Sequence, residues 1–367
     1  MTLPVFGLDA ISQVAKPAVV FDAVRSALIA HAEGWTSVPA PMVLEFPQYA
    51  GDTHVKAGHV AGTPYFVVKV ASTFGSVNNG LVLAVDATNG QPAAVLADEG
   101  KLTAWRTAAA GALITHAMTP VGVDEFAVLG TGEQALLQIL WLHELRPLRR
   151  VKVWGRRPEA VDRLCTQLQS AGLHATPDGL TGAPCVITTT AAREPLPLAA
   201  FREAIHITGI GTDMPGKGEL PPALFANAFV ATDDHAQCLH HGDLANAVQA
   251  GVIGEEDDVA AGVILRDGMP SRAAPRPPAP PAAAPPAVAP PLPTLPASDP
   301  REVSSRGLSS RRDAPPTPPP PPAPASTPGA RPLSTTLPRN HRSIADLTGV
   351  GATDAAVAGA ILRQLVR

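Results

Sequence analysis

A chain of 367 residues, with 45% hydrophobic and 16% charged residues, is long enough for one large or two medium globular domains. Its net charge of −4 provides no long-range attraction for nucleic acid or an anionic membrane, and no apolar run approaches the roughly 18 residues of a membrane-spanning helix. The first ten residues lack the basic and apolar regions of a secretory signal, and Cys165, Cys185 and Cys238 are odd in number and far apart. We therefore expect a cytoplasmic protein without a disulfide framework.

The N-terminal third predicts a helix followed by β-hairpins. The expected elements are a helix over residues 18–33, an irregular proline-containing stretch, strands over 53–60, 65–71, 81–85 and 92–96, and a helix over 103–118. Thr103 is the expected N-cap of that last helix.

Two lysines are predicted to face each other across the first hairpin. If Gly62 and Thr63 form a two-residue loop, Lys69 lies directly opposite Lys56. An ammonium in the apolar strand around Lys69 is costly unless it is paired or neutral. Because two lysines on one face repel each other, a bound anion between them would relieve the repulsion. The alternative is an edge hairpin with both lysines in solvent.

From residue 124 the pattern changes to alternating strands and helices. The expected elements are strands over 125–129, 151–154, 185–188, 205–210 and 229–232, with helices over 135–145 and 158–171. This order indicates parallel βαβ units, and we predict an α/β fold with a doubly wound parallel sheet. The tail, residues 355–366, is apolar at helical spacing.

A glycine turn joins the first of these strands to its helix. The sequence from Gly130 to Ala135, GTGEQA, fits the pattern G-x-G-x-x-G/A, in which small residues allow a tight turn and close approach to a pyrophosphate. The alternative is a plain glycine-rich turn. The predicted cofactor-binding residues in and around the sheet are Gly130, Thr131, Gly132, Gln134, Ala135, Arg156 and Thr188.

The end of the next strand bears on the choice of cofactor. Trp154-Gly155-Arg156-Arg157 stands where sites for NAD usually carry an acid that binds the ribose 2′-hydroxyl. An arginine there accommodates a 2′-phosphate, so the sequence favours NADP(H) over NAD(H). A solvated arginine pair at a strand end is the alternative.

Two further residues are candidates for the substrate site. Arg106 falls in the first turn of the helix expected from Thr103, where a guanidinium and free amides together bind a carboxylate. Asp213 follows a parallel strand, at the edge where open α/β sheets bind ligands. An exposed arginine and an ordinary turn aspartate are the respective alternatives.

A dense run of possible metal ligands follows the last predicted strand: Asp233, Asp234, His235, Cys238, His240, His241 and Asp243. The run lacks a second paired motif that would complete a tetrahedral site, so we predict a polar loop near the cofactor and no metal.

With these pieces placed, the chain resembles the ornithine cyclodeaminase/mu-crystallin family outside the proline-rich segment, and within it the iminosuccinate and ketimine reductases. The matching stretches include LTAWRTAAAG, GTGEQA and GTDMPGKGEL, which are together quite specific, and also LTGVGATDAAVA. The resemblance implies a Rossmann domain, expected over 119–271, and a substrate and dimerisation domain, expected over 1–118 and completed by a helix over 352–367. It also implies a homodimer.

The resemblance assigns roles to individual residues. Lys69 resembles the catalytic lysine that polarises the substrate carboxylate or imine, and Arg106 resembles the arginine that binds the α-carboxylate. Asp213 resembles the acid that handles water or proton transfer at the α-carbon. Val350 and Gly351 match the segment that lies near the nicotinamide, within a return segment over 342–351. An N-terminal arginine of the ornithine cyclodeaminases has no counterpart, and we expect Lys56 to replace it.

The sequence departs from the family pattern in two places. Only residues 73–80 connect two strands that relatives join with a longer loop, so part of the active-site wall is expected to be missing. In addition, 23 of the 41 prolines lie between residues 271 and 340. We expect residues 272–341 to be a disordered insertion, because the segment has almost no apolar bulk with which to form a core.

Three functions fit these observations. The first is NAD(P)H-dependent reduction of a small α-imino acid, and the three cations Lys56, Lys69 and Arg106 favour a dicarboxylic imine such as iminosuccinate. The second is a cyclodeaminase that uses bound NAD+ to expel ammonia. The third is a non-catalytic ligand binder like mu-crystallin.

Overall fold

The computed structural model describes residues 2–75, 77–178, 180–212, 214–272, 336–337 and 342–366. All of these residues belong to one compact unit. The predicted insertion, residues 272–341, lies almost entirely outside the described residues, as does Asp213. No described helix has the length and apolar character needed to cross a membrane.

The first sheet is mostly antiparallel and has the order β1-β7-β6-β5-β4-β2, with β3 also paired to β4. Its strands are β1 (Val5–Gly7), β2 (Thr36–Ser37), β3 (Met42–Phe46), β4 (Gly51–Val60), β5 (Tyr65–Phe74), β6 (Val77–Asp86) and β7 (Pro92–Ala97). Strand β3 lies in the stretch that we predicted to be irregular, and that prediction is wrong. Its first four residues are all exposed, so β3 lacks the alternation that marks a half-buried strand.

The register of β4 on β5 confirms the predicted hairpin, because Lys56 pairs with Lys69. On the next strand Val82, the partner of Lys69, is buried, so both lysines lie on the covered face of the sheet. The connection after Lys69 differs from the expected loop. Its residues lengthen β5 to Phe74 and begin β6 at Val77, so they extend a hairpin.

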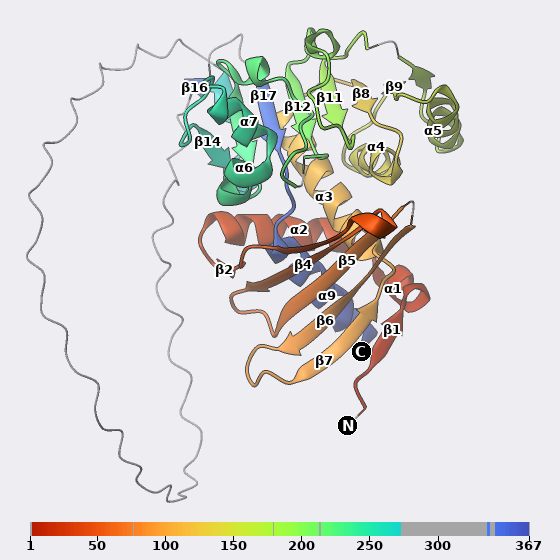
Figure 1. Cartoon of the computed structure of the whole chain (residues 1–367), viewed down its shortest axis with the longest axis vertical. Helices are drawn as coiled ribbons and strands as arrows, with labels where there is room; N and C mark the ends of the chain where they lie inside the picture. The colour runs from red at the N-terminus through yellow and green to blue at the C-terminus, as the bar shows by residue number, and fades with distance from the viewer. Residues whose placement is uncertain are drawn as a thin grey trace, which may run out of the picture. The chain divides into compact units, whose positions relative to one another are not determined.

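Helices α1 (Leu8–Val14), α2 (Pro17–Ala32) and α9 (Gly351–Leu365) pack around this sheet, and α9 lies along its covered face (Figure 1). Close packing fixes the start of α9. A side chain at Gly351 would collide with the carbonyl of Ala57, and one at Gly58 would collide with the carbonyl of Gly351. The first turn of α9 therefore lies directly on the backbone of β4.

Helix α3 (Lys101–Met118) begins earlier than predicted. Gly100 is its N-cap, with a φ of 81°, and the carboxylate of Asp98 accepts a hydrogen bond of 2.8 Å from the amide of Leu102. The assignment of Thr103 as N-cap is wrong, because Asp98 supplies this contact one turn upstream. As a consequence, Arg106 lies in the second turn, where it is buried by neighbouring elements.

The second sheet has eight parallel strands in the order β10-β9-β8-β11-β12-β17-β13-β14. The strands are β8 (Glu125–Leu129), β9 (Arg150–Trp154), β10 (Ala175–Pro177), β11 (Cys185–Thr188), β12 (His206–Gly209), β13 (Phe229–Thr232), β14 (Asp258–Ala260) and β17 (Ser343–Asp346). The helices that accompany them are α4 (Glu133–Leu145), α5 (Pro158–Ser170), α6 (His235–His241), α7 (Asp243–Gln249) and α8 (Ala261–Asp267). Short elements complete the unit: η1 (Pro47–Tyr49), η2 (Leu198–Phe201), η3 (Pro222–Phe225), β15 (Ser271–Arg272) and β16 (Thr336–Leu337).

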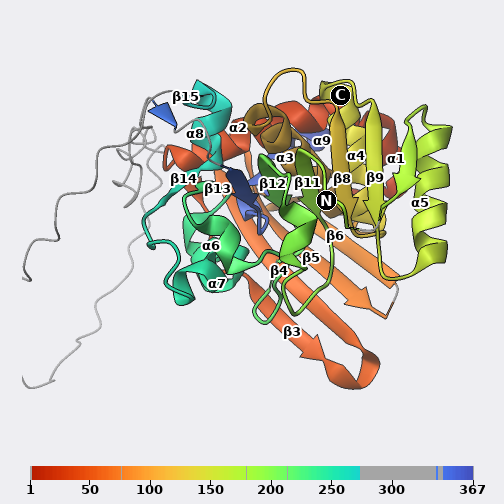
Figure 2. The same ribbon diagram turned by 90° about the horizontal axis from the view of Figure 1, so that it is seen from above.

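Both faces of this sheet are covered, which confirms the doubly wound α/β fold. Phe126 and Val128 of β8 belong to the core shared with α3, α4 and α5, whereas Ala127 and Leu129 face the core formed with η2, η3 and α7. Strands β9 and β10 are added on one side of β8, and the next strand in the chain, β11, is added on its other side. The switch in strand order therefore lies between β8 and β11 (Figure 2). Ligands of such sheets bind at the carboxyl ends of these strands.

Strand β17 was not predicted, and it occupies a central position. It follows the proline-rich segment in sequence but pairs with both β12 and β13. The guanidinium of Arg342 fixes its start by donating to the carbonyls of Ala204 and Phe201, at 2.9 Å each. The last strand of the sheet therefore leads directly into α9.

Candidate functional site

Three of the predicted substrate-site residues meet around a carboxylate that we did not predict. Asp354 lies in the first turn of α9, and Nζ of Lys69 is 3.1 Å from its Oδ1 and 3.0 Å from its Oδ2. Nε of Arg106 donates to Oδ1 at 3.0 Å. Lys69, Arg106 and Asp354 are 2%, 5% and 5% exposed. Together with Lys56, we call these residues the Asp354 cluster.

Burial controls the charges in this cluster. Desolvation is the main cause that lowers the pKa of Lys69 to about 7, with Asp354 opposing the shift and Arg106 and Lys56 adding to it. Burial acts in the opposite sense on Asp354, but Arg106, Lys69 and Lys56 together lower the pKa of its carboxyl group. Near neutral pH, Asp354 is therefore ionised while Lys69 gains or loses its proton readily.

Lys56 connects the cluster to the segment between β17 and α9. Its Nζ donates to the carbonyl of Gly349 at 2.7 Å and to that of Thr348 at 3.4 Å. From the opposite side, the carboxylate of Asp233 accepts hydrogen bonds from the amides of Thr348, at 3.0 Å, and Gly349, at 2.6 Å. Two elements thus hold this short segment in place.

Gly349 allows the segment to pass close to the arginine. Its φ is 85°, in the left-handed region that favours glycine, and a side chain there would collide with the guanidinium of Arg106. The next residues, Val350 and Gly351, are buried where α9 begins. Their predicted contact with a nicotinamide stays a prediction.

The glycine turn after β8 has the properties of a pyrophosphate site. Gly130 has a φ of 130°, and a side chain there would collide with Thr189 after β11. Nothing lies within 4 Å of the place where a side chain of Gly132 would begin, and no side chain caps α4 at this N-cap. Open space at an uncapped helix N-terminus suits an anion, so these residues fit a dinucleotide.

Hydrogen bonds bring this turn against the start of α3. The side-chain amide of Gln134 donates to the carbonyl of Ala104 at 3.0 Å, and Lys101 pairs with Glu133 at 2.7 Å. The side chain of Gln134 is therefore engaged with α3, while Ala135 is fully buried against the sheet. The predicted cofactor turn and the helix that carries Arg106 are neighbours.

The residues after β9, which bear on the choice between NAD(H) and NADP(H), lie next to the glycine turn. A side chain at Gly155 would collide with Thr131, so the turn after β9 contacts the glycine turn. Arg156 and Arg157 follow immediately and are both exposed. Their position suits the predicted contact with a 2′-phosphate.

Glu219 was missed by the sequence analysis, and it joins the ends of β11 and β12. Its buried carboxylate accepts hydrogen bonds from the hydroxyl of Thr188 at 2.7 Å, the amide of Gly211 at 2.7 Å and the amide of Thr190. Burial, with a contribution from Asp243, raises the pKa of Glu219 to about 7. This carboxylate shapes the loop edge beside the glycine turn.

Asp243 contacts the same loop edge. It accepts hydrogen bonds from the amide of Glu219 at 2.9 Å and from the hydroxyl of Thr212 at 2.9 Å. Asp213, the predicted proton-transfer residue, follows Thr212 in the chain but lies outside the described residues.

Several of the possible metal ligands between Asp233 and Asp243 make separate structural contacts. Asp234 caps α6 by accepting a hydrogen bond from the amide of Gln237, and His235 pairs with Asp258 at 2.8 Å. Asp233 and Asp243 serve the contacts described above. These four side chains therefore have structural contacts within the described part of the chain.

Asp354 could have been found in the sequence. It stands in LTGVGATDAAVA, a stretch that matched the family pattern but supplied only Val350 and Gly351 as site residues. The signal was electrostatic: three predicted cations in an apolar setting require an anion, and an acid in the first turn of an apolar helix is favoured by the helix dipole.

Comparison with known proteins identifies the family of this chain. The family model for the ornithine cyclodeaminase/mu-crystallin family matches residues 14–269. The chain belongs to this family.

The chain is also similar in sequence or fold to individual proteins. The chain is 32% identical over 250 residues to an uncharacterized cyclodeaminase of Sinorhizobium fredii, covering 64% of this chain and 75% of that protein. It is 32% identical over 176 residues to the iminosuccinate reductase of Paracoccus denitrificans, covering 47% of this chain and 55% of that protein. An archaeal alanine dehydrogenase dimer with bound NAD has a similar fold, with a TM-score of 0.74, 20% identity and coverage of 100% of this chain and 97% of that one.

The Asp354 cluster leads to a prediction about pH. If the Lys69 ammonium is the active form, activity falls as the pH rises through about 7, because the proton is lost above its pKa. Asp354 raises this pKa, so Asp354→Asn should move the falling limb of the kcat/KM profile to lower pH. The exposed pair of Arg266 and Asp267 provides the control Asp267→Asn, which should leave the limb in place. An unchanged limb in Asp354→Asn would contradict the coupling.

A second prediction concerns Glu219. In Glu219→Gln an amide N–H2 replaces one oxygen and faces the amide of Gly211 or Thr190, donor against donor. The loop edge should open, and fluorescence titration should give a Kd for NADH or NADPH raised by roughly tenfold or more. The exposed Glu194, changed to Gln, is the matched control. Equal cofactor affinity in both variants would show that Glu219 does not shape this site.

Proposed function

We propose that this protein catalyses the NAD(P)H-dependent reduction of a small α-imino acid to the corresponding amino acid. The observation that carries this proposal is the Asp354 cluster, in which Lys69 and Arg106 are buried together at 3.0–3.1 Å from one carboxylate. The glycine turn packs against the helix that carries Arg106. Family membership supports the same chemistry, since the relatives include an iminosuccinate reductase.

Each residue of the site has a part in this reaction. The guanidinium of Arg106 binds the α-carboxylate, and the ammonium of Lys69 polarises the carboxylate or the imine. Asp213 delivers or removes the proton at the α-carbon or its nitrogen, as the resemblance implies. Bound NAD(P)H supplies the hydride. Burial of the cluster excludes water, which strengthens each of these electrostatic contacts.

Asp354 changes the argument about the substrate. The three cations alone favoured a dicarboxylic imine, but Asp354 already neutralises part of their charge and Lys56 is engaged by two carbonyls. With Lys69 near its pKa, the remaining positive charge matches a substrate with one carboxylate. We therefore place monocarboxylic α-imino acids first and iminosuccinate second.

A single assay separates this reaction from its alternatives. With ammonia and either pyruvate or oxaloacetate, the absorbance of NAD(P)H should fall, and Lys69→Met should reduce kcat strongly. Lys16→Met, which changes an exposed lysine before α2, should retain the activity. Ammonia release from ornithine without net use of NAD(P)H would instead identify a cyclodeaminase, and no turnover of either kind would favour a ligand binder.

NADP(H) is proposed as the preferred cofactor, because Arg156 and Arg157 are exposed beside the glycine turn. Arg156→Glu should weaken NADPH binding much more than NADH binding, since it places a carboxylate near the 2′-phosphate. Fluorescence titration with both cofactors measures the difference. Equal losses for the two cofactors would remove Arg156 from this role.

A homodimer is proposed through the uncovered face of the first sheet. That face exposes Met42, Leu44, Phe74, Val77 and Leu81 at 38–62%. Exposed apolar side chains gathered on one sheet face are typical of an interface. Light scattering at micromolar concentration should give the mass of a dimer, and Leu44→Asp should shift the population to monomer. A monomeric wild-type protein would exclude this assembly.

A further inference from the structure

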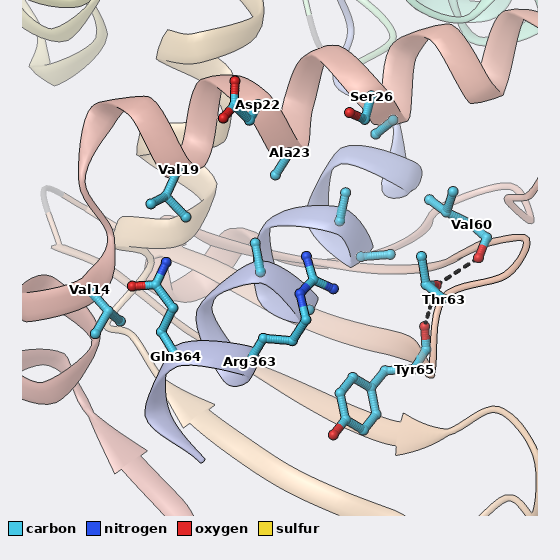
Figure 3. Close-up of a pocket in the computed structure, with 15 residues that line it drawn as sticks. Val14, Val19, Asp22, Ala23, Ser26, Val60, Thr63, Tyr65, Arg363 and Gln364 are labelled. Atoms are coloured by element: carbon cyan, nitrogen blue, oxygen red, sulfur yellow. Dashed lines mark hydrogen bonds between the residues drawn. The ribbon is translucent and has the colours of Figure 1, made fainter. Parts of the chain in front are cut away.

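A cavity of about 600 Å³ lies away from the Asp354 cluster, between α2, α9 and the turn of the β4–β5 hairpin (Figure 3). Its floor is formed by small residues of α9: Ala355, Ala356, Gly359 and Ala360. At 3.6 residues per turn these positions lie roughly opposite Asp354 on the helix. The cavity and the cluster therefore occupy opposite faces of α9.

The cavity carries one cation and one anion on different walls. Arg363 of α9 projects into the space beneath α2, and Asp22 lines the wall formed by α2 (Figure 3). The two side chains do not pair with each other, and neither has a hydrogen bond or ion pair with another described residue. Val14 and Val19 supply an apolar wall beside them.

These features define the chemistry of a ligand. A simple organic anion would pair with Arg363 but would be repelled by the carboxylate of Asp22. A zwitterion can pair with both side chains. The small-residue floor and the valines leave room for an apolar side chain, and the volume is within the range of small-molecule sites. We propose that this cavity is a second binding site, for a zwitterionic α-amino acid with an apolar side chain.

The position of the cavity connects it to the Asp354 cluster. Ala355 follows Asp354 directly in α9, and Val60 and Tyr65 end and begin the strands that carry Lys56 and Lys69. A ligand that fixes α9 against this hairpin therefore biases the position of Asp354 relative to both lysines. This regulatory consequence rests on the proposed reductase function, because an amino acid is its product. The binding itself does not.

Binding is tested by calorimetric titration of the full chain with L-leucine. Isocaproate, which lacks the ammonium, and isoamylamine, which lacks the carboxylate, should bind at least roughly tenfold more weakly. Arg363→Gln should weaken leucine binding to a similar extent. Arg163→Gln, which changes an exposed arginine of α5, should leave it unchanged.

Gly359→Leu fills the cavity and should abolish binding. The backbone position accepts a side chain, since a Cβ at Gly359 would have only Nη1 of Arg363 within 4 Å, at 3.8 Å. Melting temperatures of the variants confirm that they fold. Lys69→Met should retain leucine binding, because its substitution lies at the other face of α9.

The proposal is overturned if leucine shows no saturable binding in the millimolar range, or if binding survives Gly359→Leu and disappears in Lys69→Met. The regulatory consequence is tested separately by adding leucine to the imine-reduction assay. It should alter kcat/KM in the wild type but not in Gly359→Leu. An equal response in both proteins would overturn the coupling, whereas absent reductase activity would leave the binding result intact.

Discussion

The buried carboxylate of Asp354 is the constraint on which the site depends. Lys69 and Arg106 come from a strand and a helix of different sequence regions, and both are almost fully buried. Two cations in such surroundings are tolerated only with a counter-ion, and removing one partner of a buried pair typically costs about 3–5 kcal/mol. Asp354 therefore holds β5, α3 and α9 together, and it raises the pKa of Lys69 against the larger lowering effect of burial.

The parallel sheet places this carboxylate through its last strand. Strand β17 enters between β12 and β13, and the following residues are held by Asp233 on one side and Lys56 on the other. The turn at Gly349 then delivers the chain to the first turn of α9. Because this route begins in the parallel sheet and ends in the Asp354 cluster, the predicted cofactor and substrate sites share one continuous segment.

Sequence reasoning predicted the features that depend on local patterns. Alternation and the Gly62-Thr63 loop gave the correct register of Lys56 on Lys69, and the glycine turn at Gly130 has the expected strand–turn–helix context. It failed for features that are determined by contacts between distant elements. Strand β17 takes its place by pairing with β12 and β13, and Asp98 rather than Thr103 contacts the start of α3. Asp354 and Glu219 acquire their roles only when distant elements bring donors to them.

Transfer of deuterium tests the central claim most directly. The protein is incubated with NADPH that carries deuterium at both C4 positions of the nicotinamide, together with ammonia and pyruvate, and the amino acid product is examined by NMR. The account predicts alanine that carries deuterium at its α-carbon, formed by the wild type and not by Lys69→Met. Alanine without deuterium, or equal labelling by Lys69→Met, would contradict the assignment of the Asp354 cluster as the site of imine reduction.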